Sequence, residues 1–298
     1  MNMDIAIVGA GVVGRATGTG FALNGSRVVF YDIDPEKRWK IENSSCHTNM
    51  KFMGVREAVR ASDASFICVP TPTTLSGCYD LTYVESAARS VGRALAQKKS
   101  YHVIVLRSTV TPGVTRNVVK PILEDESGKK AGKDFGLAFN PEFLRVATAL
   151  EDFLNPSRIV IGEYDRMSGD VLEVLYSSFN ASMFRVDLEV AEMSKLVANA
   201  FLSMKISFFN EVYLWCQKLG VDQGKVSQIA ATDPRIGTYG SHGGRPFGGS
   251  CLPKDLDALI HFLNGGGEEP LLLTATKMIN EIIKVRGVKG SEVKKGVM

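Results

Sequence analysis

One cysteine of the sequence stands where its thiol could do covalent chemistry. Cys251 follows two glycines and a serine, and Pro253, Lys254 and Asp255 come shortly after it. Proline suits the first turn of a helix, so we expect a helix N-terminus here, where the helix dipole and the Lys254 ammonium favour the thiolate. Asp255, one helical turn further on, could move a proton near the sulfur. A lone cysteine is more often a small buried apolar residue, but the glycines, the proline and the two charges argue against that interpretation.

Three other polar residues could support chemistry at such a thiol. Lys195 and Asn199 are four residues apart in a stretch of helical apolar periodicity, so they share one helix face. A solvated polar face would explain these two equally well. Glu142 belongs to the segment NPEFLR, residues 140–145, which follows a predicted strand and offers a carboxylate to a ligand crevice. An acid in a loop has no special meaning by itself.

A glycine-rich loop near the start of the chain has the pattern of a dinucleotide site. Gly9, Gly11 and Gly14 follow an apolar run and open a helical pattern, so backbone amides at the helix N-terminus can approach a pyrophosphate. Asp32 ends the next predicted strand, 18 residues after Gly14. A carboxylate there would bind the adenosine ribose diol and repel a 2′-phosphate, which predicts NAD rather than NADP. The alternative is an ordinary glycine turn with a surface aspartate.

Hydroxyl and proline residues follow the third and fourth predicted strands. Pro70 and Thr71 come after one of them, and Ser108 and Thr109 come after the other. Each pair alone would be a turn with a capping hydroxyl. Because the carboxyl ends of parallel strands line the ligand crevice of such folds, the shared placement favours a cofactor-facing role.

The elements that must position these residues alternate between strands and helices in the first half of the chain. We predict strands at residues 4–8, 27–31, 65–69, 102–106, 136–139 and 158–161, with a helix at 81–97 capped by Asp80. This order predicts an α/β fold with a Rossmann-like, doubly wound parallel sheet over residues 1–186. A long helix at 188–219, ended by Gly220, opens a mostly helical central domain at 187–298 that carries the cysteine and a dimerisation surface.

The composition excludes several other classes of protein. The 298 residues carry a net charge of +3 on 35 basic and 32 acidic side chains, which disfavours nucleic acid as a partner. The five cysteines include no C-x-x-C pair, so we expect reduced thiols and no metal site. The chain contains no run of about 18 apolar residues and no basic leader, so we expect a cytoplasmic protein that does not enter a membrane.

Seven motifs in register resemble those of the UDP-glucose/GDP-mannose dehydrogenase family. They are GAGVVG at 9–14, VPTP at 69–72, STV at 108–110, NPEFLR at 140–145, AEMSKLVAN at 191–199, RIG at 235–237 and GGSCLPKD at 248–255. The resemblance implies an NAD-dependent, four-electron oxidation of the C6 alcohol of a nucleotide sugar. RIG followed by the cysteine loop is most similar to members that convert UDP-glucose to UDP-glucuronate. The alternatives are another nucleotide sugar such as GDP-mannose, or a weakly active NAD-binding partner for a fuller subunit.

The same resemblance implies roles for individual residues. Cys251 would be the nucleophile that forms the thiohemiacetal and thioester, and Lys195 with Asn199 would stabilise the oxyanion. Asp255 and Glu142 would activate water, which Thr109 would help to hold. The implied cofactor contacts are Gly9, Gly11, Val12, Val13, Gly14, Asp32, Pro70, Thr71, Ser108, Thr109 and Lys254. The implied substrate contacts are Phe143, Leu144, Arg145, Lys195, Asn199, Arg235, Phe247 and Gly248.

The chain also departs from the family pattern. Val146 occupies the place of a second glutamate, so water activation would depend on Glu142 and Asp255. Family members carry a third, Rossmann-like domain of on the order of 100 residues that covers the nucleotide. We expect this chain to lack that domain and to bind the nucleotide weakly. The family pairs through its central helix, and the apolar surface of residues 201–215 predicts a homodimer of the same kind.

Overall fold

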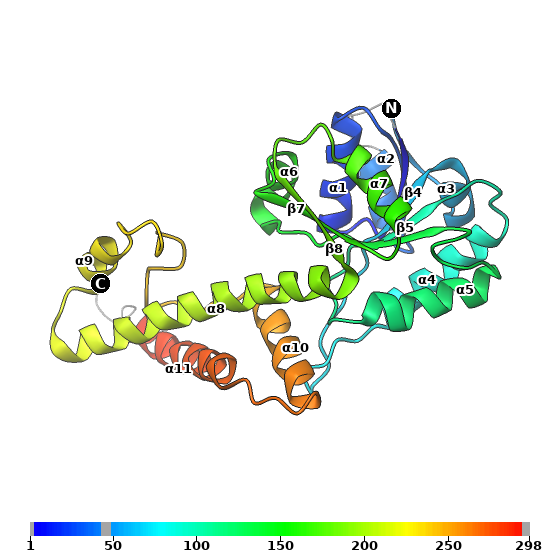
Figure 1. Ribbon diagram of the computed structural model, residues 1–298. Coiled ribbons are helices and arrows are strands. Elements are labelled where there is room, and N and C mark those ends of the chain that lie inside the picture. Colours follow the sequence, from blue (N-terminus) through cyan, green and yellow to red (C-terminus); the bar gives the residue numbers. More distant parts are fainter. Residues whose placement is uncertain (1–2, 43–48, 294–298) are drawn as a thin grey trace. The chain divides into compact units, whose positions relative to one another are not determined.

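The computed structural model describes residues 3–42 and 49–293, which form two compact units (Figure 1). The first is drawn from Met1–Pro72 and Asp80–Lys195, and the second from Thr73–Tyr79 and Leu196–Met298. The second unit therefore takes a short segment from the middle of the first. We call them unit 1 and unit 2 and describe each by itself.

Unit 1 is built on an eight-stranded sheet with the order β3-β2-β1-β4-β5-β6-β7-β8. All neighbouring strands are parallel except β6 and β7, which pair antiparallel. The order places β1 beside β4, with Ile5 opposite Ala64 and Val8 opposite Ile67. The strands are β1 (Asp4–Val8), β2 (Arg27–Tyr31), β3 (Met50–Phe52), β4 (Ala64–Ile67), β5 (Val103–Leu106), β6 (Gly136–Phe139), β7 (Arg158–Glu163) and β8 (Ser182–Asp187).

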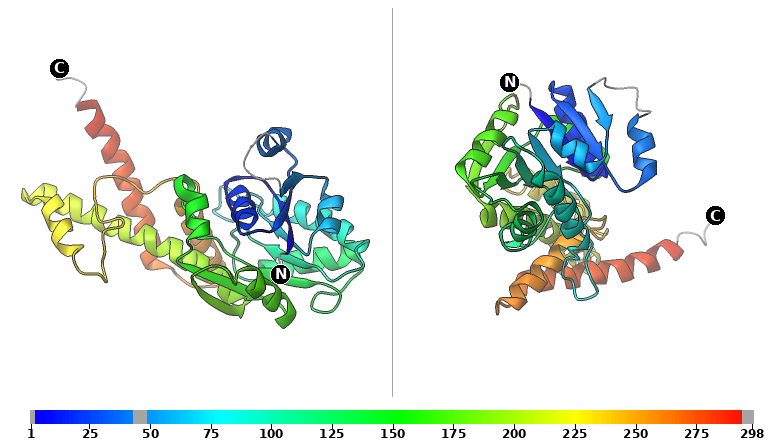
Figure 2. Two further views of the ribbon diagram at one scale, coloured as in Figure 1. Left: turned by 90° about the horizontal axis from the view of Figure 1, so that it is seen from above. Right: turned by 90° about the vertical axis from the view of Figure 1, so that its right-hand side faces the viewer.

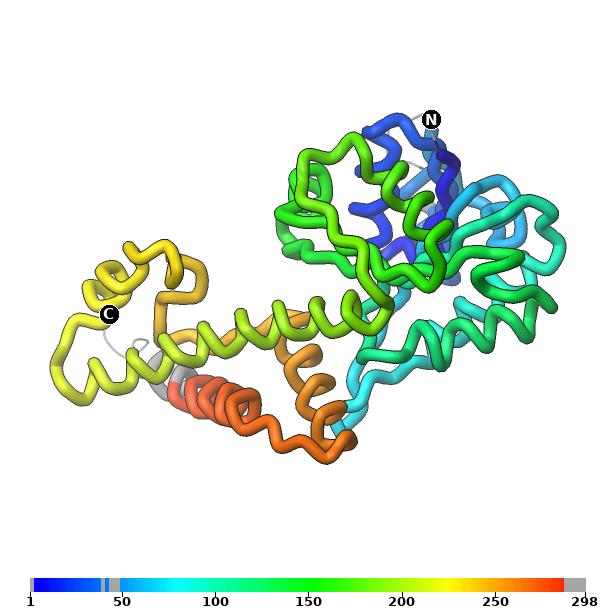
Figure 3. The backbone as a smooth tube through the Cα atoms, viewed as in Figure 1, coloured from blue at the N-terminus to red at the C-terminus, as the bar shows by residue number. Residues whose placement is uncertain are grey.

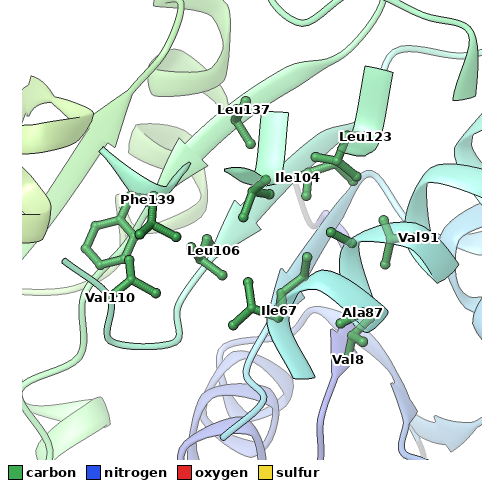
Figure 4. Packing of buried hydrophobic residues seen from close by; sticks show 14 of the residues in the cluster. Val8, Ile67, Ala87, Val91, Ile104, Leu106, Val110, Leu123, Leu137 and Phe139 are labelled. Atoms are coloured by element: carbon green, nitrogen blue, oxygen red, sulfur yellow. The ribbon is translucent and has the colours of Figure 1, made fainter. Parts of the chain in front are cut away.

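Helices cover both faces of this sheet, so the central strands are buried on both sides (Figures 1 and 2). Ile104 and Leu106 of β5 join one apolar cluster, part of which Figure 4 shows, whereas Val103 and Val105 join the other. This alternation explains why the central strands are continuous apolar runs. The helices are α1 (Val12–Leu23), α2 (Pro35–Glu42), α3 (Val55–Ala61), α4 (Thr82–Ala96), the π-helical turn η1 (Thr115–Val119), α5 (Lys120–Ser127), the short turn η2 (Val146–Thr148), α6 (Ala149–Leu154) and α7 (Arg166–Leu175).

The predicted Rossmann-like α/β fold is confirmed, with differences at its edges. The pattern predicted six strands, and the structure adds β3 and β8 as the two outer strands. β3 has three residues and β8 is half exposed along its length, so neither carries the continuous apolar pattern of a buried strand. The sheet is also not wholly parallel, because β7 runs against β6. The helix predicted at 81–97 spans Thr82–Ala96, and its N-cap is Leu81 rather than the predicted Asp80, although Asp80 accepts a hydrogen bond from the Thr82 amide.

Unit 2 is mostly helical. Its elements are α8 (Leu188–Leu219), α9 (Gln223–Ala230), α10 (Leu252–Gly265) and α11 (Leu271–Val293). α8 has the predicted bounds and ends at Gly220, whose φ is +70°. The division between the compact units falls inside α8, because Leu188 and Ala191 still pack in the apolar cluster of the sheet.

A hairpin of residues 73–79 completes unit 2. Figure 3 lets the reader follow the chain out to this hairpin, which lies beside α10. Thr73 and Tyr79 form an antiparallel bridge. Gly77 has a φ of +88°, and a Cβ atom there would lie 3.2 Å from the carbonyl oxygen of Asp257. Ser76 presents its carbonyl oxygen 3.1 Å from Nδ1 of His261. The hairpin is thus anchored to α10.

Candidate active site

Two glycines of the loop between β1 and α1, Gly9 and Gly14, leave no room for larger residues. Gly9 has a φ of +102°, and a Cβ atom on it would lie 2.6 Å from the carbonyl oxygen of Cys68. A Cβ atom on Gly14 would collide with the carbonyl oxygen of Gly9. Gly11 is the N-cap of α1, and Val12 and Val13 follow it in the first turn. The backbone amides at this helix start are therefore open to a phosphate group.

Asp32 is fixed at the end of β2 by contacts to both sides. Its carboxylate accepts hydrogen bonds from the backbone amides of Ala10 at 2.6 Å and Asp34 at 2.9 Å. The ammonium of Lys37 lies 3.2 and 3.3 Å from the two carboxylate oxygens. Sequence reasoning missed Lys37, although a lysine in the helix that follows the acid was visible. Lys37 places a positive charge beside the group predicted to repel a 2′-phosphate.

The loops after β4 and β5 are tied together at one edge of the sheet. Thr71 donates its hydroxyl hydrogen to the carbonyl oxygen of Thr109 at 2.8 Å, and Ser108 donates to that of Val69 at 2.7 Å. The sequence placed both pairs at the carboxyl edge, where the structure puts them. Because their hydroxyls are engaged with backbone, Thr71 and Ser108 shape the loops, while Pro70 is exposed.

Glu142 and Lys195 form a buried ion pair in unit 1. The Lys195 Nζ atom lies 3.0 Å from Oε1 of Glu142, and both side chains are less than a tenth exposed. The other oxygen of Glu142 accepts a hydrogen bond from the Leu144 amide at 2.6 Å. The Lys195 ammonium also lies 5.4 Å from the ring centre of Phe143. The solvated surface that could have explained Lys195 is excluded, because the side chain is buried.

The loop 140–145 lines a cavity of about 300 Å³ in unit 1, together with two arginines that the sequence did not single out. Arg107 is buried, donates to the Asn140 carbonyl oxygen at 3.2 Å and the Tyr176 hydroxyl at 3.3 Å, and keeps an unpartnered Nε. The guanidinium carbon of Arg158 lies 3.6 Å from the ring centre of Phe143, and burial lowers the pKa of Arg158. Neither has a carboxylate partner among the described residues, and with Arg145 they give the cavity wall three guanidinium groups against the two carboxylates of Glu142 and Asp152.

The predicted substrate residues of this loop do come together. Glu142, Phe143, Leu144 and Arg145 all line the cavity. Nη2 of Arg145 lies 2.5 Å from Oδ1 of Asp152, and this contact lowers the pKa of Asp152 to about 2. The pair braces the loop against α6.

Asp255 is the centre of a second buried cluster, in unit 2. The carboxylate is 1% exposed. Its Oδ2 accepts a hydrogen bond from Asn199 at 2.6 Å, and its Oδ1 accepts one from Lys254 at 2.5 Å. Tyr79 donates its hydroxyl hydrogen to the same Oδ1 at 2.6 Å. The sequence analysis named Asn199, Lys254 and Asp255 separately but missed Tyr79.

Cys251 stands at the start of α10, as predicted, in the N-cap position. Its side chain is neither fully buried nor fully exposed. The sulfur lies 3.7 Å from the Ser250 hydroxyl oxygen, and the Asp255 amide donates to the Cys251 carbonyl oxygen at 2.9 Å. A half-exposed thiol at a helix N-terminus is suited to nucleophilic attack.

The other predicted substrate residues of unit 2 have contacts of their own. The Arg235 side chain is 87% exposed, and its Nη2 lies 2.6 Å from Oδ2 of Asp233 in the same turn. Phe247 is buried, and its amide and carbonyl group both bond to Asn280 of α11. Gly248 has open space around it. The structure therefore assigns these three no ligand contact, and their substrate role stays a prediction.

Two further expectations concern metals and membranes. Within residues 3–42 and 49–293, histidine, cysteine and acidic side chains form no group that could hold a metal ion. Four cysteines are free thiols, and Cys46 lies outside the described residues. Among the helices described, none has the length and apolar character needed to cross a bilayer.

Comparison with known proteins matches most of the chain to one family. Residues 3–180 match the NAD binding domain of the UDP-glucose/GDP-mannose dehydrogenase family, and residues 189–282 match its central domain. A GDP-mannose 6-dehydrogenase from Pseudomonas syringae pv. syringae is 42% identical over 278 residues, which cover 87% of this chain and 64% of the relative. A UDP-glucose 6-dehydrogenase from Haloferax volcanii is 34% identical, over 94% of this chain and 70% of its own length.

Solved structures give the same result. A UDP-glucose dehydrogenase from Pyrobaculum islandicum superposes with a TM-score of 0.91 at 38% identity, over 95% of this chain and 68% of its own. A ternary complex of GDP-mannose dehydrogenase from Pseudomonas aeruginosa gives a TM-score of 0.75 at 37% identity, over 93% of this chain and 68% of that one. The chain thus spans about two thirds of the length of these relatives.

Proposed function

Because this chain belongs to the UDP-glucose/GDP-mannose dehydrogenase family, we propose that it oxidises the C6 alcohol of a nucleotide sugar to the carboxylate with NAD. The observation that carries the proposal is the arrangement at the start of α10. A half-exposed thiol, Cys251, begins the helix, and one turn later a buried carboxylate, Asp255, is bonded to Asn199 and Lys254. A domain that only binds NAD needs neither group.

The residues of unit 1 fit NAD. Gly9 and Gly14 let the loop pack closely against backbone, Gly11 has open space beside it, and the amides of the first turn of α1 would face a phosphate. Asp32, held by the Ala10 amide, would accept the ribose hydroxyls, with Lys37 beside it. When bound, NAD accepts hydride from the sugar carbon. Pro70, Thr71, Ser108 and Thr109 would complete the wall of the cofactor site.

The sugar chemistry would proceed through Cys251. The first hydride transfer leaves an aldehyde at C6, and the Cys251 sulfur adds to the aldehyde carbon to form a thiohemiacetal. Loss of a second hydride from that carbon leaves a thioester. Water attacks the thioester carbonyl, the carbon–sulfur bond breaks, and the acid and the thiol are released. One alcohol, two NAD⁺ and one water thus give one carboxylate, two NADH and three protons.

The remaining polar residues would serve the charged stages of this sequence. Lys195 and Asn199 would stabilise negative charge on the C6 oxygen, because an ammonium and an amide donor are suited to an oxyanion. Asp255 and Glu142 would take the protons of the attacking water. The positive cavity lined by Phe143, Leu144 and Arg145 favours a ligand that carries negative charge, as a nucleotide sugar does.

Two nucleotide sugars are candidates. The RIG motif and cysteine loop favour UDP-glucose, which would give UDP-glucuronate. GDP-mannose is favoured by a different observation, because the GDP-mannose 6-dehydrogenases among the sequence relatives are 40–45% identical and the UDP-glucose 6-dehydrogenases 34–37%, whereas the two solved structures differ little, at 37% and 38%. Absorbance of NADH during incubation with NAD and each sugar separates the two. NAD binding without NADH from any nucleotide sugar would instead indicate a partner subunit of low activity.

We also propose that the protein is a cytoplasmic homodimer. Val197, Phe201, Phe208 and Trp215 of α8 are each more than half exposed, although all are apolar. Their spacings of four and seven residues place them on one helix face. A second copy of the helix would cover this face. Light scattering should give a mass of twice 32.4 kDa.

A further inference from the structure

The hairpin 73–79 belongs to unit 2, although its neighbours in sequence on both sides belong to unit 1. Its own hydrogen bonds close it, since the Thr74 amide donates to the Cys78 carbonyl oxygen at 2.8 Å. Its tip is anchored to α10 by the contact between Ser76 and His261. The close approach of Gly77 to the backbone of Asp257 adds a second anchor. The last residue of the hairpin, Tyr79, is therefore held in place beside α10.

The buried hydroxyl of Tyr79 has a single acidic partner. It donates to Oδ1 of Asp255 at 2.6 Å. Burial, together with the neighbouring carboxylate, raises the pKa of Tyr79 far above its usual value, so the phenol stays neutral and acts as a donor. The Lys254 ammonium lies 4.6 Å from the centre of the same ring and bonds to the same oxygen. Tyr79 thus supports Asp255 directly through its hydroxyl and indirectly through Lys254.

We infer that Tyr79 is a positioning residue that fixes Asp255 in the orientation needed to take a proton. The inference depends on the proposed function, in which Asp255 activates water. Without the Tyr79 hydroxyl, Oδ1 would keep only Lys254, whose side chain is 22% exposed and flexible. Asn199 would still hold Oδ2. The carboxylate could then rotate about its remaining donors, because one of the hydrogen bonds to its Oδ1 is lost.

The variant Tyr79→Phe separates these effects from a general loss of structure. It keeps the ring beneath Lys254 and removes only the hydroxyl. The groups that face Asp255 are Lys254 of α10, Asn199 of α8 and Tyr79 of the hairpin, with the Cys251 sulfur close enough to help raise the pKa of Tyr79. One hydrogen bond to a charged group is lost, so kcat should fall about tenfold while KM changes less than about twofold.

A second readout does not need activity. In protein labelled with ¹³C-aspartate, the carboxyl resonance of Asp255 is identified by its loss in Asp255→Asn. Its chemical shift should change in Tyr79→Phe, because the carboxylate loses one of its hydrogen bonds. Tyr83→Phe is the matched control, because Tyr83 is 45% exposed on α4 and touches none of these groups. It should leave both readouts unchanged.

The outcomes separate the two proposals. A changed Asp255 resonance together with a lower kcat at a nearly unchanged KM supports the positioning role. A changed resonance in a protein that makes no NADH from any nucleotide sugar would reject the proposed function and keep the positioning role. A fall in kcat without any change in the Asp255 resonance would overturn the inference, since it would show that the hydroxyl only stabilises the fold. An unchanged resonance and an unchanged rate would overturn it as well.

Discussion

The two buried carboxylates proposed to handle protons, Glu142 in unit 1 and Asp255 in unit 2, are held in different ways. Glu142 has one charged partner, Lys195, which is itself buried, and one backbone amide. Asp255 has three side-chain donors, of which two are neutral and the third, Lys254, reaches solvent. The charge of the Glu142 carboxylate is therefore balanced by one ammonium group, whereas the Asp255 carboxylate is stabilised by several donors together. Removal of one partner should be far more costly at Glu142.

Lys195→Met tests the charged half of this comparison and should have the largest effect on stability. It leaves a carboxylate buried without its counter-ion, which should lower the free energy of unfolding by about 3–5 kcal/mol. Urea denaturation measures it. The double variant Lys195→Met with Glu142→Gln should recover much of the loss, because no charge is left unpaired. Arg235→Met breaks an exposed pair and is the control, with an expected change below about 1 kcal/mol. Equal losses of unfolding free energy in Lys195→Met and Arg235→Met would contradict the comparison.

Asp255→Asn tests the other side of the comparison, the carboxylate that has three side-chain donors. The amide keeps the shape of the side chain but loses charge-assisted bonds to Lys254 and Tyr79, so the free energy of unfolding should fall by only about 1–3 kcal/mol. The rate of NADH production should fall by about 10²–10⁴, the usual contribution of a general base. Parallel urea curves and NADH assays check both. A stability loss larger than that of Lys195→Met would reverse the order proposed here.

Some of these features could be predicted from the sequence and others could not. The glycine loop, the bounds of α8 and the helix start at Cys251 depend on local patterns, and all were predictable from sequence. The cavity arginines were not, because Arg107 directly follows a buried strand and Arg158 begins one, and neither has a spacing rule. Tyr79 was beyond any local pattern, since 176 positions separate it from Asp255. The edge strands β3 and β8 were missed because half-exposed, short strands lack a distinct periodicity.

A third carboxylate, Asp32, sharpens the comparison and should show the smallest effect. It is paired with a partly exposed lysine, Lys37. Wild-type protein should bind NAD at least about tenfold more tightly than NADP, because Asp32 would face the 2′-phosphate. Lys37→Ala should widen the ratio by a few-fold, since a positive charge beside the 2′-phosphate is removed. Fluorescence titration with both cofactors measures it, and a narrower ratio would show that Lys37 does not face the phosphate.

The yield of NADH per molecule of sugar tests the central claim most directly. With limiting nucleotide sugar and excess NAD, the wild-type protein should give two NADH for each sugar consumed, because one alcohol loses two hydrides. Cys251→Ser should stop this reaction after at most one slow turnover, since a serine hydroxyl at neutral pH is a far weaker nucleophile than the thiol. Its affinity for NAD should change less than about threefold, because the glycine loop belongs to unit 1. A Cys251→Ser variant that still yields two NADH per sugar at a rate near that of the wild type would contradict the account.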